Sequence, residues 1–316
     1  MSEKLNISSN PHIRDERSTM SIMLDVIIAL LPACIFSVYN FGFRALLVIV
    51  VTVMAAVLSE AGYEFILKKK LTISDLSAVV TGLLLALNLP YTIPLWIAVL
   101  GSIFAIVVVK MVFGGLGQNF MNPALGARCF LLLSFTSQMT NFVYDGITSS
   151  TPLYNVKHGM AFDLFSMFVG REPGTIGETS VIALVIGGLY LLVKRVIDYR
   201  IPVFYIGSFT IFAMLYSLAT KDFSMRFVLA ELFGGGLMLG AWFMATDYVT
   251  SPITKKGKIV YGILLGIMTG LFRLVAGDTA AAEGVSYAII FSNLLVPIID
   301  KYCPVKGFGL ERDKNE

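Results

Sequence analysis

Long apolar runs separated by short polar stretches dominate this chain, and ten of the runs are candidate membrane-spanning helices. A helix needs about 20 apolar residues to cross the hydrocarbon core of a bilayer, and fewer where it is broken or re-entrant. The candidate segments are 21–41, 44–67, 75–89, 94–113, 122–135, 180–198, 201–219, 227–249, 258–275 and 283–300. This pattern predicts an all-α polytopic membrane protein.

The third and fifth segments are shorter than the others, and helix-breaking residues flank or interrupt both. Pro90 and Pro94 follow the third segment, whereas Asn122-Pro123 and Gly126 surround the fifth. Short segments that Gly or Pro interrupts are typical of half-helices in transporter-like folds. We therefore expect some of the ten segments to be re-entrant or broken.

The lysine and arginine residues divide unevenly between the two sides that ten spans define. With the N-terminus in the cytoplasm, most of them fall in inside segments or at inside helix ends. The outside holds only Arg44, Lys157, Arg171, Lys221, Arg226 and Arg273, and Arg128 falls within the membrane. By the positive-inside rule this asymmetry favours ten spans with both termini inside. The loop at 136–179 then lies outside.

The composition supports the same class of protein. Of 316 residues, 56% are hydrophobic and 14% charged, whereas soluble domains carry about 25% charged residues. The net charge of +3 decides little, because the placement of Lys and Arg matters more than their sum. Residues 1–20 are polar and contain no apolar core before a cleavage site, so we expect no signal peptide.

A weak internal repeat relates the two halves of the chain. A shift of 158 residues superposes Gly82 on Gly240, Thr92 on Thr250, Pro94 on Pro252 and Gly126 on Gly284. Five spans per half is an odd number, so the halves would cross the bilayer in opposite directions, and a site often lies between such repeats. Chance matches in a chain rich in Ala, Gly and Leu are the alternative.

This interpretation divides the chain into five parts. They are a cytoplasmic N-terminal segment (1–20), a first five-helix repeat (21–135), an external loop (136–179), a second five-helix repeat (180–300) and a cytoplasmic tail (301–316).

The external loop contains a dense run of small and hydroxyl residues, Asp145-Gly146-Ile147-Thr148-Ser149-Ser150-Thr151, which Pro152 closes. It resembles the site at which a flavin transferase couples the phosphate of FMN to a threonine. That reaction needs a free hydroxyl, small neighbours that give access, and a carboxylate that can orient the metal–flavin donor. Asp145, Gly146, Thr148, Ser149 and Ser150 meet the last two needs, and Thr151 is the acceptor. The alternative is a simple turn, since these residue types all favour turns.

Three stretches together resemble the RnfD/NqrB family, and the resemblance covers most of the chain in the same order. They are Ser9-Asn10-Pro11-His12-Ile13-Arg14, Asn122-Pro123-Ala124-Leu125-Gly126-Ala127-Arg128 and the run that ends at Thr151. The family comprises membrane subunits of the Rnf and Na⁺-translocating NADH:quinone oxidoreductase complexes. The short N-terminus is most like RnfD, since NqrB proteins carry a longer extension.

The resemblance implies a fold similar to that of urea transporters, with two inverted five-helix repeats, and an FMN phosphodiester at Thr151. The chain departs from the family where Ser149-Ser150 stands in place of the common Gly-Ala. Both residues are small, so the transferase should still have access.

The resemblance also implies a role as one relay in a larger complex, without catalysis by this chain alone. Electrons would pass between ferredoxin and NAD⁺ through flavins and iron–sulfur centres on several subunits, coupled to Na⁺ or H⁺ movement. The expected partners are subunits A, B, C, E and G, a flavin transferase and the lipid bilayer, with no nucleic acid. A second, non-covalent flavin such as riboflavin is a further expectation, and no motif locates it. The chain has no Rossmann glycine fingerprint, so NAD and ferredoxin would dock elsewhere.

Charged residues inside apolar segments are functional candidates by default. Arg128 is the strongest, since it follows a broken helix and could meet a flavin phosphate or ring oxygen; the alternative is pairing with a carboxylate or with helix carbonyls. Glu60 and Glu64 precede Lys68 at helical spacing, which predicts an interfacial ion-pair ladder.

Two further carboxylates, Glu231 and Glu283, could line an ion path, although their positions at helix ends favour solvated or snorkelling roles. The three cysteines (Cys34, Cys129 and Cys303) stand far apart and only two histidines occur, too few for a zinc site or a four-thiolate cluster within one chain. The sequence does not exclude an iron–sulfur cluster whose ligands come from this chain and a partner subunit.

The rival hypothesis for function is a stand-alone channel or secondary transporter for a small solute, without a flavin. The repeat and the short segments suggest it. The presence or absence of a covalent flavin distinguishes the two hypotheses.

Overall fold

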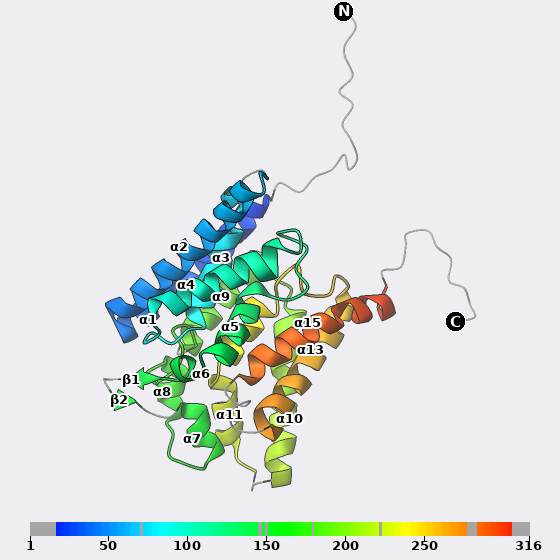
Figure 1. Ribbon diagram of the computed structural model, residues 1–316. Coiled ribbons are helices and arrows are strands. Elements are labelled where there is room, and N and C mark those ends of the chain that lie inside the picture. The colour runs from blue at the N-terminus through cyan, green and yellow to red at the C-terminus, as the bar shows by residue number, and fades with distance from the viewer. Residues whose placement is uncertain are drawn as a thin grey trace, which may run out of the picture.

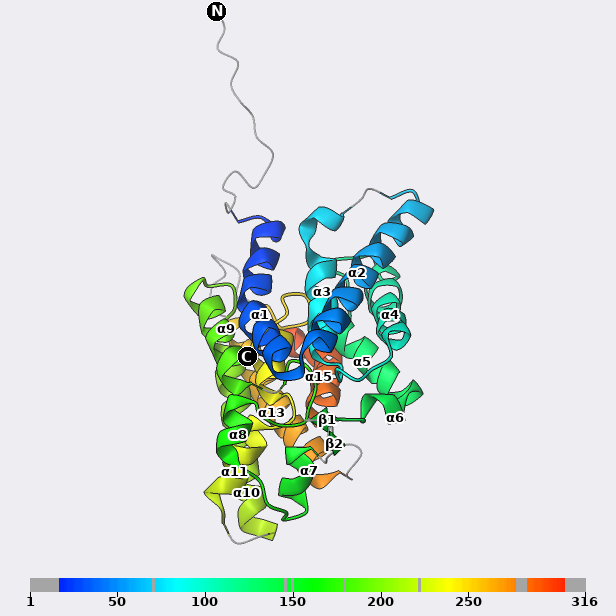
Figure 2. The same cartoon turned by 90° about the vertical axis from the view of Figure 1, so that its left-hand side faces the viewer.

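The computed structural model describes residues 17–69, 72–144, 147–148, 151–178, 180–220, 223–276 and 283–304. Over these residues the chain is a bundle of helices with one small hairpin (Figures 1 and 2). A helix is present at each of the ten apolar segments, which confirms the prediction of an all-α protein.

The first half of the bundle contains five apolar helical elements and one short 3₁₀ turn, η1. They are α1 (Thr19–Phe41), α2 (Phe43–Ile66), η1 (Ile73–Asp75), α3 (Ser77–Leu87), α4 (Leu95–Ile103) continued by the π-helical η2 (Phe104–Met111), and α5 (Pro123–Ser134). The start of α5 follows from its sequence, because Asn122 accepts hydrogen bonds from the N–H groups of Ala124 and Leu125. Pro123 occupies the first helical position, where its missing N–H costs nothing.

The connecting loop contains three short helices and the hairpin. These are α6 (Thr136–Met139), β1 (Val143–Tyr144), β2 (Ile147–Thr148), α7 (Pro152–Lys157) and α8 (Leu164–Val169). The strands are antiparallel, with Val143 opposite Thr148. The hairpin, α7 and α8 gather at the end of the bundle where α11 also lies (Figures 1 and 2).

The second half contains another five helical elements, one of them bent. They are α9 (Val181–Val193), α10 (Arg200–Thr220), α11 (Met225–Phe233) followed by α12 (Leu237–Leu239) with the π-helical η3 (Gly240–Met244), α13 (Lys255–Gly270) continued by the π-helical η4 (Leu271–Val275), and α15 (Gly284–Tyr302). The axes of α11 and α12–η3 differ by 59°. Gly235 and Gly236 make this break with φ angles of +63° and +70°, which side chains rarely adopt.

Five of the described helices are long and apolar enough to cross a membrane: α1, α2, α10, α13–η4 and α15. The bent pair of α11 and α12–η3 makes a sixth if it counts as one span, and four shorter helices (α3, α4–η2, α5 and α9) are also apolar. Large apolar side chains such as Tyr39, Phe65 and Val193 are exposed on the outside of the bundle. Together these features define a multi-pass membrane protein.

The helices pack in groups that bring distant parts of the sequence together. Helix α1 lies along α9, and α2 packs on α3 and α4 (Figure 2). The closest contact is between α10 and α13, where Gly262, Gly266 and Gly270 follow one another at intervals of four residues. A Cβ at any of these glycines would collide with α10, so the small residues let the two backbones approach. Arg273 follows three residues beyond Gly270 and is buried inside the bundle.

Candidate functional site

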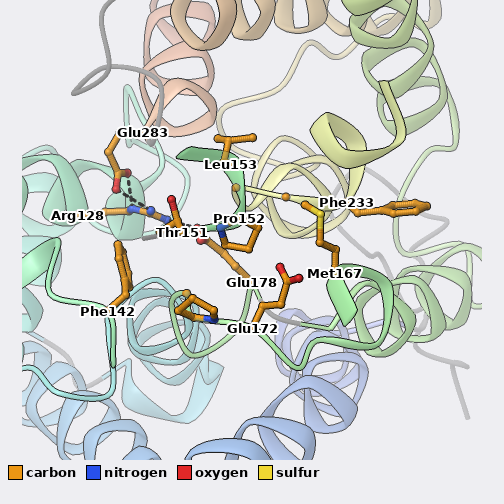
Figure 3. Close-up of a pocket in the computed structure, with 14 residues that line it drawn as sticks. Arg128, Phe142, Thr151, Pro152, Leu153, Met167, Glu172, Glu178, Phe233 and Glu283 are labelled. Carbon is orange, nitrogen blue, oxygen red and sulfur yellow. Dashed lines mark hydrogen bonds and ion pairs between the residues drawn. The ribbon is translucent and has the colours of Figure 1, made fainter. Parts of the chain in front are cut away.

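A pocket lies where the connecting loop covers the bundle, and residues from seven parts of the chain line it (Figure 3). Its walls are apolar, from Phe142, Leu153, Met167 and Phe233. Its charged side chains are Arg128, Glu172, Glu178 and Glu283. Thr151, the predicted acceptor of the flavin, also lines this pocket.

Thr151 is the residue that caps α7. Its hydroxyl oxygen accepts a hydrogen bond of 3.4 Å from the N–H of Tyr154, and Pro152 occupies the first helical position. Such a cap needs the hydroxyl only as an acceptor, so the cap leaves the hydroxyl proton uncommitted. Thr151 is half-buried. The backbone around Thr151 therefore forms a helix cap, much as the alternative of a simple turn predicted. The Thr151 side chain nevertheless lines the pocket.

The other predicted residues of the flavin run cannot be placed in the same way. Asp145, Gly146, Ser149 and Ser150 lie outside the described residues, as does the predicted motif at 9–14. Thr148 is described only as backbone of β2.

Arg128 projects from α5 into a network of acceptors, and only 4% of it is exposed. It forms ion pairs of 2.6 Å with Glu178 and 2.7 Å with Glu283, and it also donates to the side chain of Asn88. Nη2 of Arg128 donates to Oε1 of Glu283 at 2.9 Å, and the 2.7 Å ion pair joins Nε to Oε2 of the same carboxylate. Of the two roles considered for Arg128, the structure shows the pairing with carboxylates. The network ties α5 to the loop and to the start of α15.

Glu178 reaches Arg128 because residues 171–178, here called the strap, are held against the end of α3. The N–H groups of Ile176 and Gly177 donate to the carbonyls of Leu89 and Leu87, at 2.9 and 2.7 Å. These carbonyls lie at the C-terminal end of α3, where the helix has no partners of its own for them. The Ser37 hydroxyl donates to the carbonyl of Ile176 from α1. The strap therefore has a fixed backbone.

Glu172, near the start of the strap, forms no ion pair among the described residues, unlike the other two glutamates of the pocket. Its Oε2 atom is buried and has no hydrogen-bond partner among the described residues. Burial, together with the negative charge of Asp163, raises the pKa of Glu172 to about 7. Asp163 itself caps α8, and hydrogen bonds from Ser166 and Phe165 keep its pKa below the usual value. Sequence reasoning missed both Glu172 and Glu178, which give no local signal in a polar loop.

A buried cation in the first half was also missed. Lys110, at the end of η2, lies 2.6 Å from Glu60 and donates to the Ser77 hydroxyl at the start of α3. Glu64 accepts hydrogen bonds from the N–H and hydroxyl of Thr72. The predicted interfacial ladder of Glu60, Glu64 and Lys68 is wrong, since Glu60 and Glu64 are buried and bind other partners.

The second half has a buried cation of its own. Arg273, on η4, donates to the carbonyls of Glu231, Gly234 and Gly235, at 2.7, 3.0 and 2.5 Å. Its guanidinium also lies 3.7 Å from the Glu231 carboxylate. The solvated or snorkelling roles predicted for Glu231 and Glu283 are wrong, because both are buried against arginines. The glycine run 234–236 was the available signal, because a broken helix leaves carbonyls that need donors.

These two cations also change what the charge asymmetry means. Ten spans place Lys110 inside and Arg273 outside, but each is only 1% exposed. They are partners of buried groups and carry no information about solvated loops.

A second pocket lies at the opposite end of the bundle, beside the start of α3 and α5. Lys110, Asn119, Asn122 and Asp247 are among its polar lining. Asn119 is 9% exposed, and its side-chain oxygen has no partner among the described residues. This end of the molecule therefore also offers an unsatisfied polar group to a ligand.

The fold and its pockets define a polytopic helical membrane protein with charged networks buried between its halves. Within that class the chain belongs to the NQR2, RnfD, RnfE family, which matches residues 6–309. The resemblance seen in the sequence is thereby confirmed.

Three relatives illustrate this membership, and each is named as the D component of an ion-translocating complex. The chain is 46% identical to that of the Na(+)-translocating ferredoxin:NAD(+) oxidoreductase complex of Acetobacterium woodii, over 99% of this chain and 98% of the relative. It is 41% identical to that of the proton-translocating ferredoxin:NAD(+) oxidoreductase complex of Clostridium ljungdahlii, over 97% and 96%. It is 36% identical to that of the ion-translocating oxidoreductase complex of Vibrio cholerae, over 96% and 99%.

Proposed function

We propose that this chain is the electron-transfer membrane subunit of an Rnf-type complex, which couples ferredoxin:NAD⁺ electron transfer to Na⁺ or H⁺ translocation. It would carry FMN bound to Thr151 through a phosphodiester and would not be catalytic alone. The observation that carries the proposal is the position of Thr151 on a pocket that both apolar and charged side chains line. The names of relatives at 46% and 41% identity support the complex.

The residues of the pocket fit a flavin. The isoalloxazine ring has an apolar benzenoid end, which suits Phe142, Leu153 and Phe233, and a polar end with an N–H group. The Oε2 atom of Glu172, buried and without a partner among the described residues, marks a polar position in the pocket for that end of the ring. When bound, FMN would supply a centre that exchanges one or two electrons, and so joins one-electron carriers.

The charges of the pocket bear on the role of Arg128. Its guanidinium is already shared by Glu178 and Glu283, so a phosphate would have to compete with two carboxylates. We therefore propose that Arg128 contributes to the flavin site by holding these carboxylates and the strap in position. The phosphodiester, itself an anion, is then better placed at the solvent-facing rim beside Thr151.

The transported ion is left open between Na⁺ and H⁺. The relatives at 46% and 41% identity are named for different ions, although both align with nearly the whole chain. Overall similarity at this level therefore does not select the ion.

We further propose that the ten apolar elements form two inverted five-helix repeats, similar to those of urea transporters. The shift of 158 residues supports this. It moves the start of α2 from 43 to 201 and that of α4 from 95 to 253, next to the starts of α10 at Arg200 and α13 at Lys255.

The directions of equivalent helices support inversion as well. Helix α4 begins beside the connecting loop, where the Thr92 hydroxyl donates to the carbonyl of Asn141, and η2 ends at the second pocket. Its counterpart α13–η4 ends beside the same loop, where Lys157 donates to the carbonyl of Ala276. With both termini cytoplasmic, the flavin loop would face outward from the bacterial inner membrane.

The expected partners are the other subunits of the complex (A, B, C, E and G) and a flavin transferase for maturation. We also propose a second, non-covalent flavin such as riboflavin. Its candidate binding site is the pocket that Asn119 and Lys110 line. An acid extract of the purified protein should then contain free flavin, and Asn119→Leu should reduce it. An extract without flavin from wild-type protein would contradict this part of the proposal.

The covalent flavin is tested by producing the chain together with a flavin transferase. The wild-type band should fluoresce under ultraviolet light on a denaturing gel, and the peptide that contains Thr151 should gain the mass of an FMN moiety. Thr151→Val should abolish both signals. Thr140→Val, the same change elsewhere in the loop, should keep them, because the Thr140 hydroxyl bonds within its own turn. A colourless wild-type band would favour the rival hypothesis of a small-solute transporter.

A further inference from the structure

Among the described residues, Glu172 is the one acidic side chain of the loop pocket with a buried oxygen that no ion pair or hydrogen bond compensates. Glu178 and Glu283 both pair with the guanidinium of Arg128, which offsets one of their two negative charges. Figure 3 shows Glu172 on the side of the pocket near Pro152 and Met167, without a dashed contact. We propose that Glu172 is a proton-binding group that couples the charge of a cofactor in this pocket to proton uptake from the outer aqueous phase. This inference rests on the proposed flavin at Thr151.

The strap keeps Glu172 in the pocket. Ile176 and Gly177 are hydrogen-bonded to the end of α3, and a Cβ at Gly177 would lie only 2.5 Å from the Cβ of Leu87. Pro173 follows Glu172 directly and restricts the backbone between it and these anchors. These contacts anchor the strap on α3, and Glu172 lies on the part of the strap that lines the pocket.

The charged neighbours of Glu172 come from several elements. The negative charge of Asp163, at the start of α8, acts on Glu172, and two further carboxylates line the same pocket, Glu178 on the strap and Glu283 at the start of α15. The positive charges are Arg128 on α5, which the two pocket glutamates neutralise, and the adjacent Arg171 on the strap. Burial and Asp163 are what raise the pKa of Glu172 to about 7.

Charge added to the pocket would raise this pKa further. A one-electron carrier of the complex would supply the electron, and a flavin bound here would become more negative by one unit when it takes up no proton itself. A like charge nearby disfavours a carboxylate, so ionised Glu172 takes up to one proton from solvent and becomes neutral. When the electron leaves, the proton returns to solvent, and the cycle balances. Because Glu172 is half-buried, its carboxyl can exchange protons with the outer solution.

The direction of the pH dependence follows. Below about pH 6 Glu172 is already neutral, so adding the electron requires no proton at this position. Above about pH 7 the carboxyl is ionised before reduction, so proton uptake accompanies the electron and the midpoint potential of the flavin falls as pH rises. A bend in the plot of potential against pH near pH 7 is the expected sign.

The test is a spectroelectrochemical titration of the covalent flavin in the purified complex at several pH values. Wild-type protein should show the bend, Glu172→Gln should lose it, and Asp163→Asn should move it to lower pH, because removing that negative charge lowers the pKa of Glu172. Asn can still cap α8, so this second variant preserves the local fold. Asp25→Asn, at the opposite end of the bundle, is the matched control and should behave as wild type.

The possible results separate the two proposals. If mass analysis finds no flavin on Thr151 in wild-type protein, the proposed function fails. If the flavin is present but Glu172→Gln titrates like wild type, only the role of Glu172 is overturned. If Glu172→Gln does not retain the flavin, Asp163→Asn decides: a shifted bend supports the inference and an unshifted one rejects it.

Discussion

In the first half of the chain a lysine is buried at the end of the fourth apolar helix, and in the second half an arginine is buried at the corresponding end. Lys110 contacts a carboxylate and a hydroxyl, whereas Arg273 contacts three backbone carbonyls and, more distantly, a carboxylate. The two cations lie at opposite ends of the bundle, one beside each pocket. Each cation lies near the end of a π-helical segment, but the two are surrounded by different chemical groups.

The backbone around each cation explains the difference. Helix α3 begins at Ser77, just after the short η1 turn, and the groups near Lys110 are side chains, Glu60 and the Ser77 hydroxyl. The break between α11 and α12 instead leaves the carbonyls of Gly234 and Gly235 without helical partners. A guanidinium has five donors in a fixed fork and can satisfy several carbonyls at once, which an ammonium group does less well. The residue type therefore follows from how the third element of each half is built.

The largest effect is expected from changing Arg273. Arg273→Leu removes the donors for three buried carbonyls and leaves Glu231 without its cation, so it should cost about 3–5 kcal/mol of stability. Arg273→Lys keeps the positive charge but loses the planar set of donors of the guanidinium, so it should lose less stability than Arg273→Leu. The measurement is thermal unfolding of the detergent-solubilised protein. A lysine variant as unstable as the leucine variant would show that charge contributes little here.

A smaller net effect is expected in the first half, because both charges of its pair can be removed together. Lys110→Met alone leaves Glu60 buried and uncompensated, at a cost of about 3 kcal/mol. Adding Glu60→Leu should recover much of that loss, since the pair then becomes apolar. A double-mutant cycle of unfolding free energies measures the coupling. If the double variant is as unstable as the sum of the single variants, the two side chains do not act as a pair.

The smallest effect is expected from the helix break itself. Gly235→Ala places a Cβ at a φ of +63° and against the Arg273 guanidinium, so it should destabilise by about 1–2 kcal/mol. Gly207→Ala on α10 is the matched control, because nothing lies within 4 Å of its Cβ position. That control should be neutral or slightly stabilising, since alanine favours helix. Equal melting temperatures for the two variants would mean that the bend does not depend on glycine.

Regular features of the chain were predictable because each depends on neighbours in sequence. All ten apolar segments are helical, and Asn122-Pro123 begins α5 as such a pair should. Prediction fails where the partner of a side chain lies far along the chain. Helical spacing predicts a ladder in which Glu60, Glu64 and Lys68 follow one another at intervals of four residues. Glu60 instead binds Lys110, which is fifty residues away.

The loop pocket shows the same division. A local run of small residues points to its hydroxyl residue, Thr151, and a charge within an apolar segment points to Arg128. Glu172 and Glu178 give no such signal, because a glutamate in a polar loop looks like any solvated residue until the strap is seen on α3. Arg128 meets the carboxylates of Glu178 and Glu283 only in the folded protein.

The sequence by itself determined that this protein is a helical membrane protein of its family, and where its helices lie. Hydrophobicity and helix capping act over a few residues, so they can be read along the chain. Only the tertiary structure decided which buried charges meet, because electrostatic compensation in a membrane protein acts across helices. The buried Oε2 atom of Glu172, which has no partner within the part of the chain that the structure describes, is likewise a property of the assembled pocket, since its burial comes from the packing of the loop over the bundle.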